Sequence, residues 1–280
     1  MTGFTEPRDN TGVQPAAALA DGLRRLADML GPYASVGAIF IAWELTAQLE
    51  LVIPFLLPAL SVVLVRIFTD TISGQLPFDI AITLYRTLVA FTLAGVVGVT
   101  LGLLISRISL VRWFFDPIIS IGLPMPKIAL LPIFMLWFGL FDLSKILMVA
   151  FSASFQIIIA TWSATQGVDK ELIWSARSLG ASDREVLWQV ILPASLPQIL
   201  TGLQIAMPIC LIVILVTEMV MGGQGLGDSM LRSARYVDTP GVFAGIVEIG
   251  IVGICVIRTM EYLRRRLLVW HTETMKEATV

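Results

Sequence analysis

The stretch "LGASDREVLWQVILPASLP", residues 179–197, differs from the sequence on both sides of it. It begins with a glycine joint at Gly180, carries Asp183, Arg184 and Glu185, and ends with two prolines. Long apolar runs rich in Val, Ile, Leu and Phe flank it. A polar, punctuated segment between such runs indicates a loop that leaves an apolar domain and returns to it.

The composition favours a membrane domain. Of the 280 residues, 56% are hydrophobic and 14% are charged, against about 25% charged in an average soluble domain. Several apolar runs approach the ~20 residues that a helix needs to cross a bilayer. We therefore predict an all-α membrane protein with six transmembrane helices, and set aside a soluble protein with a large core.

The chain divides into a polar cytoplasmic segment (1–30), a transmembrane domain (31–268) with a cytoplasmic loop at 168–200, and a cytoplasmic tail (269–280). The first segment lacks the basic start and apolar core of a signal peptide. An interfacial helix is expected within residues 59–78. The six predicted spans are Tyr33–Ile53, Ile80–Ser106, Asp116–Leu140, Ser144–Thr165, Gly202–Met221 and Gly241–Tyr262.

Small residues and prolines shape two of these spans. In the second span Gly95, Gly98 and Gly102 recur at intervals of three and four, which lets helix backbones approach closely in lipid. The third span contains three prolines and is predicted to be broken; they are Pro124, Pro126 and Pro132.

Basic residues predict the orientation, because loops rich in Lys and Arg stay in the cytoplasm. With both termini inside, the cytoplasmic side receives Arg24, Arg25, Arg107, Arg112, Lys170, Arg177, Arg184 and Arg264 to Arg266. The outer side receives only Arg66, Lys145, Arg232 and Arg235. The loop at 168–200 therefore lies in the cytoplasm in this interpretation.

Within that loop, the pattern predicts two short helices around a glycine joint. Asp169 can cap a helix that begins at Lys170 and ends near Gly180, where a left-handed residue suits a helix end. Ser182 and Glu185 form an S-x-x-E capping box that opens the second helix. Two prolines discourage its simple continuation into the fifth span; they are Pro193 and Pro197.

Both helices carry an apolar stripe, which can pack on the domain itself, lie on the bilayer, or bind a partner protein. A loop that lies on anionic lipid is usually more basic than this one. Here acidic residues alternate with basic ones, which suits a protein surface better; they are Asp169, Glu171, Asp183 and Glu185.

The segment "WSARSLGASDREVLWQVILPASLP" (174–197) resembles the cytoplasmic EAA loop of ABC-importer permeases. The family pattern begins with Glu-Ala-Ala, and this chain has Trp174 in place of the Glu and Ser175 in place of the first Ala. Glu171 can supply the acidic side chain from the preceding helical turn. The positions that match are Ala176, Gly180, Val190, Leu192 and Pro193. Other stretches look like the nitrate, sulfonate and taurine branch of this family, among them "PMPKIALLPIFMLWFGLFDLSKIL" (124–147), so that the similarity covers about residues 50–268.

The resemblance implies a type I importer (MetI-like) permease fold in the bacterial inner membrane. The implied partners are a second copy of the chain, two ATPase subunits and an external solute-binding protein, with no nucleic acid. The resemblance also implies that ATP closes the ATPase dimer and that the loop transmits this motion to the permease. The residues assigned to this coupling loop are Glu171, Ala176, Gly180, Ser182, Asp183, Glu185, Val190, Leu192 and Pro193.

Neither catalysis nor nucleotide binding is expected of this chain. It has no G-x-x-x-x-G-K-[ST] phosphate loop, and "GGQGLGD" (222–228) lacks the strand-to-helix context of a dinucleotide site. Cys210 and Cys255 fall inside predicted spans, and His271 lies in the tail, so we expect no metal and no cofactor. An integral-membrane enzyme is set aside for the same reasons. The alternative left open is a secondary transporter or channel that works without an ATPase.

Charged residues inside spans are costly and mark candidate functional positions. Arg86 and Glu218 both lie near outer ends of spans, and we expect them to form an ion pair that braces an outer gate. Glu248 lies deeper in the sixth span and can pair with a neighbour, line the pathway or be protonated. For the solute itself, the resemblance suggests a small anion.

Overall fold

A computed structural model describes residues 34–268. The predicted terminal segments, 1–30 and 269–280, lie outside the described residues. Within 34–268 the chain is helical and contains no strand. The chain divides after Val62 into two compact units.

In the described part of the first unit, a helix occupies residues 34–48. Trp43 Nε1 donates a hydrogen bond to the carbonyl of Pro58 at 2.9 Å. The helix ends at residue 48 rather than at the predicted Ile53, because a turn follows in which Glu50 has a φ of 52°. The described helix rises only about 22 Å, less than a hydrocarbon core of about 30 Å. That this segment crosses the membrane stays a prediction.

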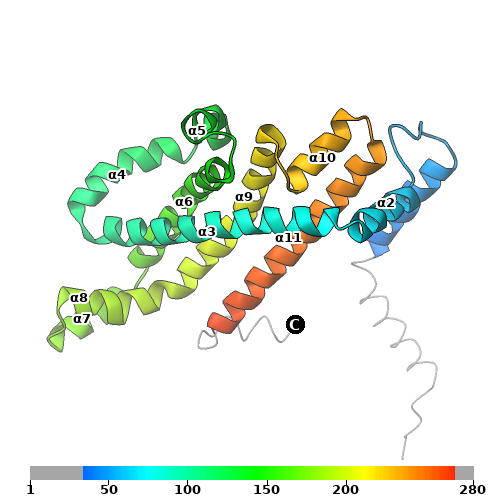
Figure 1. Cartoon of the computed structure of the whole chain (residues 1–280). Helices are drawn as coiled ribbons and strands as arrows, with labels where there is room; N and C mark the ends of the chain where they lie inside the picture. The colour runs from blue at the N-terminus through cyan, green and yellow to red at the C-terminus, as the bar shows by residue number, and fades with distance from the viewer. Residues whose placement is uncertain (1–33, 269–280) are drawn as a thin grey trace, which may run out of the picture. The chain divides into compact units, whose positions relative to one another are not determined.

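The remaining helices follow in chain order, as Figure 1 shows. They are α2 (Leu60–Ile72), α3 (Gln75–Arg107), α4 (Ser109–Gly122), η1 (Lys127–Leu130), α5 (Leu131–Phe138), α6 (Asp142–Gln166), α7 (Lys170–Ser178), α8 (Asp183–Glu185), the π-helix η2 (Val186–Ile191), α9 (Leu192–Met221), α10 (Leu226–Arg235) and α11 (Thr239–Leu267). The expected interfacial helix corresponds to α2, and Gly74 at a φ of 80° separates it from α3.

Among the described residues, four helices are long and apolar enough to cross a membrane: α3, α6, the run Asp183–Met221 and α11. They contain the predicted second, fourth, fifth and sixth spans. The predicted third span is α4 followed by η1 and α5, bent by 97° at a break, and it makes a fifth crossing if the bent pair is one span. The prolines Pro124 and Pro126 lie in that break, as the sequence predicts.

The fifth span begins earlier than predicted, because Pro193 and Pro197 do not interrupt it. Helical structure runs without a gap from Asp183 through η2 to Met221. The wider π turn ends just before Leu192, so Pro193 stands in the first turn of α9, where its missing N–H costs little. Pro197 lies inside α9.

The core of the second unit forms where α3, α6 and α9 pack together. Ala90, Ala153 and Ile214, one from each helix, are fully buried in it. Gly98 and Gly102 face α6, where a Cβ at Gly98 would lie 2.7 Å from Ile157 Cβ. This confirms the predicted close approach through small residues.

We call the end of this bundle where α6 ends at Gln166 the loop end, and the end where α6 begins at Asp142 the far end. At the far end, α10 lies between α9 and α11, where the sequence predicts only a connection between the fifth and sixth spans (Figure 1). The glycine-rich turn at 222–225 has positive φ at Gly222, Gly223, Gln224 and Gly225, and α10 starts directly after it.

Candidate functional site

The predicted glycine joint and capping box are present at the loop end. Gly180 has a φ of 87°, and a Cβ there would meet nothing within 4 Å, so backbone conformation alone favours glycine. Ser182 Oγ accepts from the Glu185 backbone N–H at 3.4 Å. Glu185 Oε2 in turn accepts from the Ser182 N–H at 2.8 Å. The backbone of Asp169 begins α7, but its side chain makes no capping hydrogen bond, contrary to the prediction.

The two helices of the loop fold on each other around a small apolar cluster. Val168, Val186 and Ile191 are buried, and Ala176 packs against them. Arg177 and Asp183, on the two sides of Gly180, form an ion pair with an N–O distance of 2.7 Å. Part of the predicted apolar stripe therefore packs on the loop's own helices.

The rest of the loop is open at its surface. Four large apolar side chains are exposed there: Leu172, Trp174, Leu179 and Trp188. Of the predicted coupling residues, Glu171, Gly180, Ser182, Asp183, Glu185 and Pro193 are exposed, whereas Ala176, Val190 and Leu192 are half-buried. This surface combines polar and apolar groups, as a protein-binding surface does.

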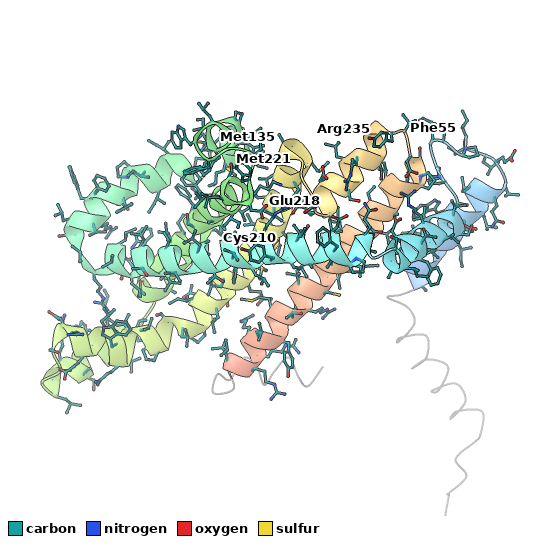
Figure 2. The ribbon with its side chains drawn as sticks, in the orientation of Figure 1. Phe55, Met135, Cys210, Glu218, Met221 and Arg235 are labelled. Atoms are coloured by element: carbon teal, nitrogen blue, oxygen red, sulfur yellow. The ribbon has the colours of Figure 1, made fainter. Side chains whose placement is uncertain are left out.

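At the far end the structure brings Arg86 and Glu218 together. Arg86 Nη1 lies 2.8 Å from Glu218 Oε1, and the two side chains are 4% and 0% exposed. Arg86 also pairs with Asp142 at 2.7 Å. Thr83 Oγ1 contacts both carboxylate oxygens of Glu218, at 3.1 and 2.9 Å. Figure 2 labels Glu218 on α9, facing the neighbouring helices.

This ionic cluster also anchors the glycine-rich turn. Arg86 Nη1 donates to the carbonyl of Gln224 at 2.7 Å, and Lys145 Nζ donates to that of Gly222 at 2.6 Å. Asp79 Oδ1 accepts from the Gly225 N–H at 2.9 Å. Asp79, Asp142 and Lys145 were not among the residues predicted for a site. Each of them is a charged residue within a few positions of the end of a predicted span. Only the fold shows that these charges come together.

Glu248 does not join that cluster. It is 9% exposed, and its Oε1 makes no hydrogen bond in the described part of the chain. Pairing with a neighbour, one of the three roles considered for Glu248, is therefore not seen for this oxygen. Glu248 lines a polar cavity of about 150 Å³ together with Arg66, Asp70, Arg232 and Asp238. Arg66 pairs with both Asp70 and Asp238, at 2.8 and 2.7 Å.

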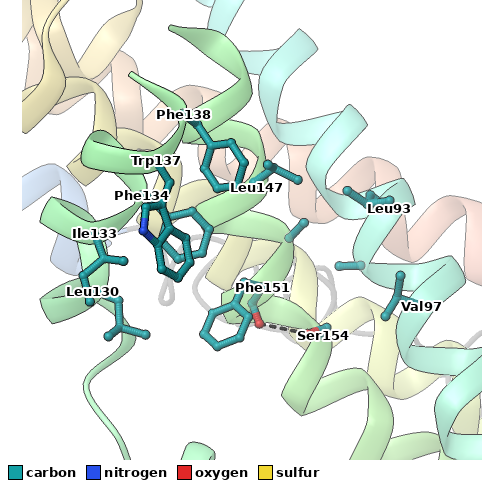
Figure 3. Close-up of a pocket in the computed structure, with 12 residues that line it drawn as sticks. Leu93, Val97, Leu130, Ile133, Phe134, Trp137, Phe138, Leu147, Phe151 and Ser154 are labelled. Atoms are coloured by element: carbon teal, nitrogen blue, oxygen red, sulfur yellow. Dashed lines mark hydrogen bonds between the residues drawn. The ribbon is translucent and has the colours of Figure 1, made fainter. Parts of the chain in front are cut away.

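Two further cavities lie along the bundle. One, of about 530 Å³, is lined by α3, η1, α5 and α6 and is apolar apart from Ser154, whose hydroxyl donates to Phe151 (Figure 3). The other, of about 190 Å³, lies at the break before η1 and is lined by Lys127, Ser152 and Gln156 among apolar residues. Lys127 was not predicted as a site residue. In the sequence it could have been noticed as a lysine between the prolines of the broken span.

Similarity to known proteins agrees with this architecture. The family described as "Binding-protein-dependent transport system inner membrane component" matches residues 94–269. The taurine transport system permease protein TauC of Escherichia coli is 32% identical over 85% of this chain and 89% of its own length. An aliphatic sulfonates transport permease protein, SsuC of Bacillus subtilis, is 33% identical over 83% of this chain and 85% of its own.

Solved structures share the fold. A chain of an amino acid ABC transporter crystallised with histidines has a TM-score of 0.59 at 19% identity, covering 71% of this chain and 96% of that one. A chain of the MetNI methionine ABC transporter in an inward-facing conformation has a TM-score of 0.53 at 20% identity, covering 68% and 98%.

Proposed function

Because this chain belongs to the binding-protein-dependent transport system inner membrane components, the membrane permeases of ABC importers, we propose that it moves a small sulfonate-type anion into the cytoplasm. The chain is a transport permease and not an enzyme, and ATP is hydrolysed by a separate subunit. This membership sets aside a secondary transporter or channel without an ATPase. The substrate class is supported by relatives named for taurine and aliphatic sulfonates.

Within that function, the loop at 168–200 is the contact through which the ATPase drives the permease. The observation that carries this proposal is the geometry of the loop. After α7 the chain turns at Gly180, which has positive φ, and a capping box then sets the direction of the next helix. That second helix continues without a gap into α9. A push on the loop therefore reaches a membrane-crossing helix through continuous backbone hydrogen bonds.

The test is Gly180→Val, compared with Gly250→Val in α11. Neither site has a neighbour within 4 Å of the added Cβ, but only Gly180 has positive φ. Left-handed backbone costs a non-glycine residue roughly 1–2 kcal/mol, and β-branched residues fit it worst. We expect Gly180→Val to insert normally but to lose co-purification with the ATPase and ATPase stimulation by the loaded binding protein. Normal assembly and stimulation of Gly180→Val would contradict the coupling role.

The functional unit is proposed to be a homodimer, with the pathway between two copies, two ATPase subunits inside and one solute-binding protein outside. Among the described residues, many large apolar side chains are exposed on the single chain, including Trp113, Leu136 and Trp137 at 76%, 83% and 68%. Lipid and a second copy can both cover such surface. Native mass spectrometry of the purified complex should find two permease chains, and a single chain per active complex would contradict this arrangement. The chain itself is proposed to bind no cofactor.

A further inference from the structure

We propose that the cavity at the break between α4 and η1 binds the anionic group of the transported solute, with Lys127 as its cationic contact and Gln156 as a second donor. This inference rests on the proposed function, because it takes the solute to be a small organic anion. It adds the place in the permease where that anion is held.

The break places irregular backbone inside the predicted third membrane span. α4 ends at Gly122, η1 begins at Lys127, and the helices on the two sides are bent by 97°. Non-helical backbone within the membrane is tolerated only where protein covers it or where it lines a water-filled cavity. Leu123, Lys127 and Ile128 line the cavity of about 190 Å³ at this break. The interruption in the helix therefore forms one wall of a site.

The opposite wall comes from two membrane-crossing helices. Ser152 and Gln156 belong to the middle third of α6, and Ile209 and Val213 belong to α9. The cavity thus lies away from both ends of the bundle, at a depth that a solute must pass. Its volume falls below the roughly 300–1,000 Å³ of pockets for drug-sized ligands. It suits a small head group with a short alkyl chain against the apolar residues.

Lys127 supplies a charge without a counter-charge. Its Nζ donates to the Leu123 carbonyl at 3.1 Å and lies 5.1 Å from the centroid of the Phe155 ring. Within residues 34–268, no carboxylate lies within ion-pair distance of it. An ammonium has three N–H donors, so two remain for a guest. A lysine at this depth is costly unless it faces a cavity or a partner, and an anion provides that partner.

Gln156 offers the second set of donors. Its side-chain amide makes no hydrogen bond within the described part of the chain, although the residue is only half-exposed. Ser152, by contrast, donates its hydroxyl hydrogen to the Met148 carbonyl at 2.8 Å. One ammonium and one amide can together hold two oxygens of a sulfonate or carboxylate.

The other two cavities described above lack this combination. The apolar cavity of about 530 Å³ has no charged residue in its lining. In the polar cavity beside Glu248, Arg66 and Arg232 are already paired with carboxylates. Asp70, Asp238 and Glu248 also line that cavity and would repel an anion. Of these three, the cavity at the break is the one that offers an unpaired cation.

The first experiment measures uptake of radiolabelled ethanesulfonate into proteoliposomes that contain the permease, its ATPase and its binding protein. Lys127→Met removes the charge and keeps the length, whereas Lys127→Arg keeps the charge. We expect Lys127→Met to lower uptake about tenfold or more, the value of one charge-assisted hydrogen bond. Lys127→Arg should retain much of it. ATPase stimulation by the loaded binding protein should persist in both, because the loop at 168–200 is unchanged.

The second experiment adds a carboxylate to the cavity. Gln156→Glu places an anion on the same lining as Lys127 and should block ethanesulfonate uptake. Gln166→Glu is the matched control, since it makes the same change at an exposed position of α6 outside the cavity. If Lys127→Met fails to assemble with the ATPase, Gln156→Glu decides the matter.

The outcomes separate the two proposals. Normal uptake by Lys127→Met, or by Gln156→Glu relative to Gln166→Glu, overturns the anion subsite and leaves the permease function intact. A wild-type complex that hydrolyses ATP with loaded binding protein but takes up no ethanesulfonate overturns the sulfonate class, and the subsite falls with it. Loss of uptake with retained ATPase stimulation supports the subsite.

Discussion

Arg86 shows how one buried charge can organise several segments. It contacts Glu218 on α9, Asp142 on α6 and the Gln224 carbonyl, so it ties two helices and the glycine-rich turn to α3. Removing one partner of such a buried pair leaves the other charge without compensation, which costs about 3–5 kcal/mol. The pairing was expected from the sequence, whereas a role in gating stays a prediction.

The first residue-level prediction is a double-mutant cycle. Arg86→Met and Glu218→Gln should each lower the unfolding temperature in detergent, and the double variant should lose less than the sum, with a coupling of roughly 0.5–3 kcal/mol. Arg258→Met is the control: its partner is Glu261 and its side chain is 76% exposed, so little change is expected. Additive losses in the cycle would argue against energetic coupling across the pair.

Between α3 and α6, glycines set the distance. A Cβ at Gly98 would lie 2.7 Å from Ile157 Cβ, and one at Gly102 would lie 2.6 Å from Thr161 Cβ. At Gly95 the nearest atom would be Leu203 Cδ2 at 3.6 Å, which is an ordinary contact. Neighbouring glycines of one helix thus differ in what they face.

These distances predict different costs for the same substitution. Gly98→Ala should push α3 from α6 and cost roughly 1–3 kcal/mol, as overpacking does. Gly95→Ala should be neutral or slightly stabilising, because alanine favours the helix. Differential scanning fluorimetry of the two purified variants measures the contrast. Equal shifts for both would show that these contacts do not limit the packing of α3 on α6.

The loop helices depend on local capping. Glu185→Ala removes the acceptor for the Ser182 N–H and should cost roughly 0.5–1 kcal/mol of local stability. We expect faster amide hydrogen exchange over residues 183–191 and weaker, but not abolished, ATPase stimulation. Asp169→Ala is the comparison, because the Asp169 side chain makes no capping hydrogen bond. Equal rates of amide hydrogen exchange in the two variants would contradict a stabilising role for the capping box.

The orientation of the chain is a prediction for intact cells. In a Cys255→Ser background, in which Cys210 is buried, a membrane-impermeant maleimide should label Ala234→Cys but not Ser178→Cys. Both positions are exposed, so access rather than burial decides the result. Positive charge concentrated on the Ser178 side is the physical reason. External labelling of Ser178→Cys would reverse the topology and place the coupling loop outside.

Local features could be predicted from the sequence because their causes lie within a few residues. The Gly180 joint and the Ser182–Glu185 box rest on backbone conformation and on hydrogen bonds across three positions. The break of the third span follows from prolines that cannot continue a helix. Apolar length alone identified the four long helices, since an apolar helix of that length requires lipid or partners around it.

Packing decided what no local pattern encodes. Asp142 pairs with Arg86 across 56 positions of sequence. Glu248 Oε1 has no hydrogen-bond partner within residues 34–268, although its helix was predicted correctly. Lys127 and Gln156 line the same cavity only because η1, α6 and α9 meet at the break. Continuation of α9 through two prolines also depended on a π turn, which neighbouring residues alone do not dictate. For Asp142 and for Lys127 the deciding neighbours come from helices distant in the chain, and the energy of such contacts arises only once those helices are packed together.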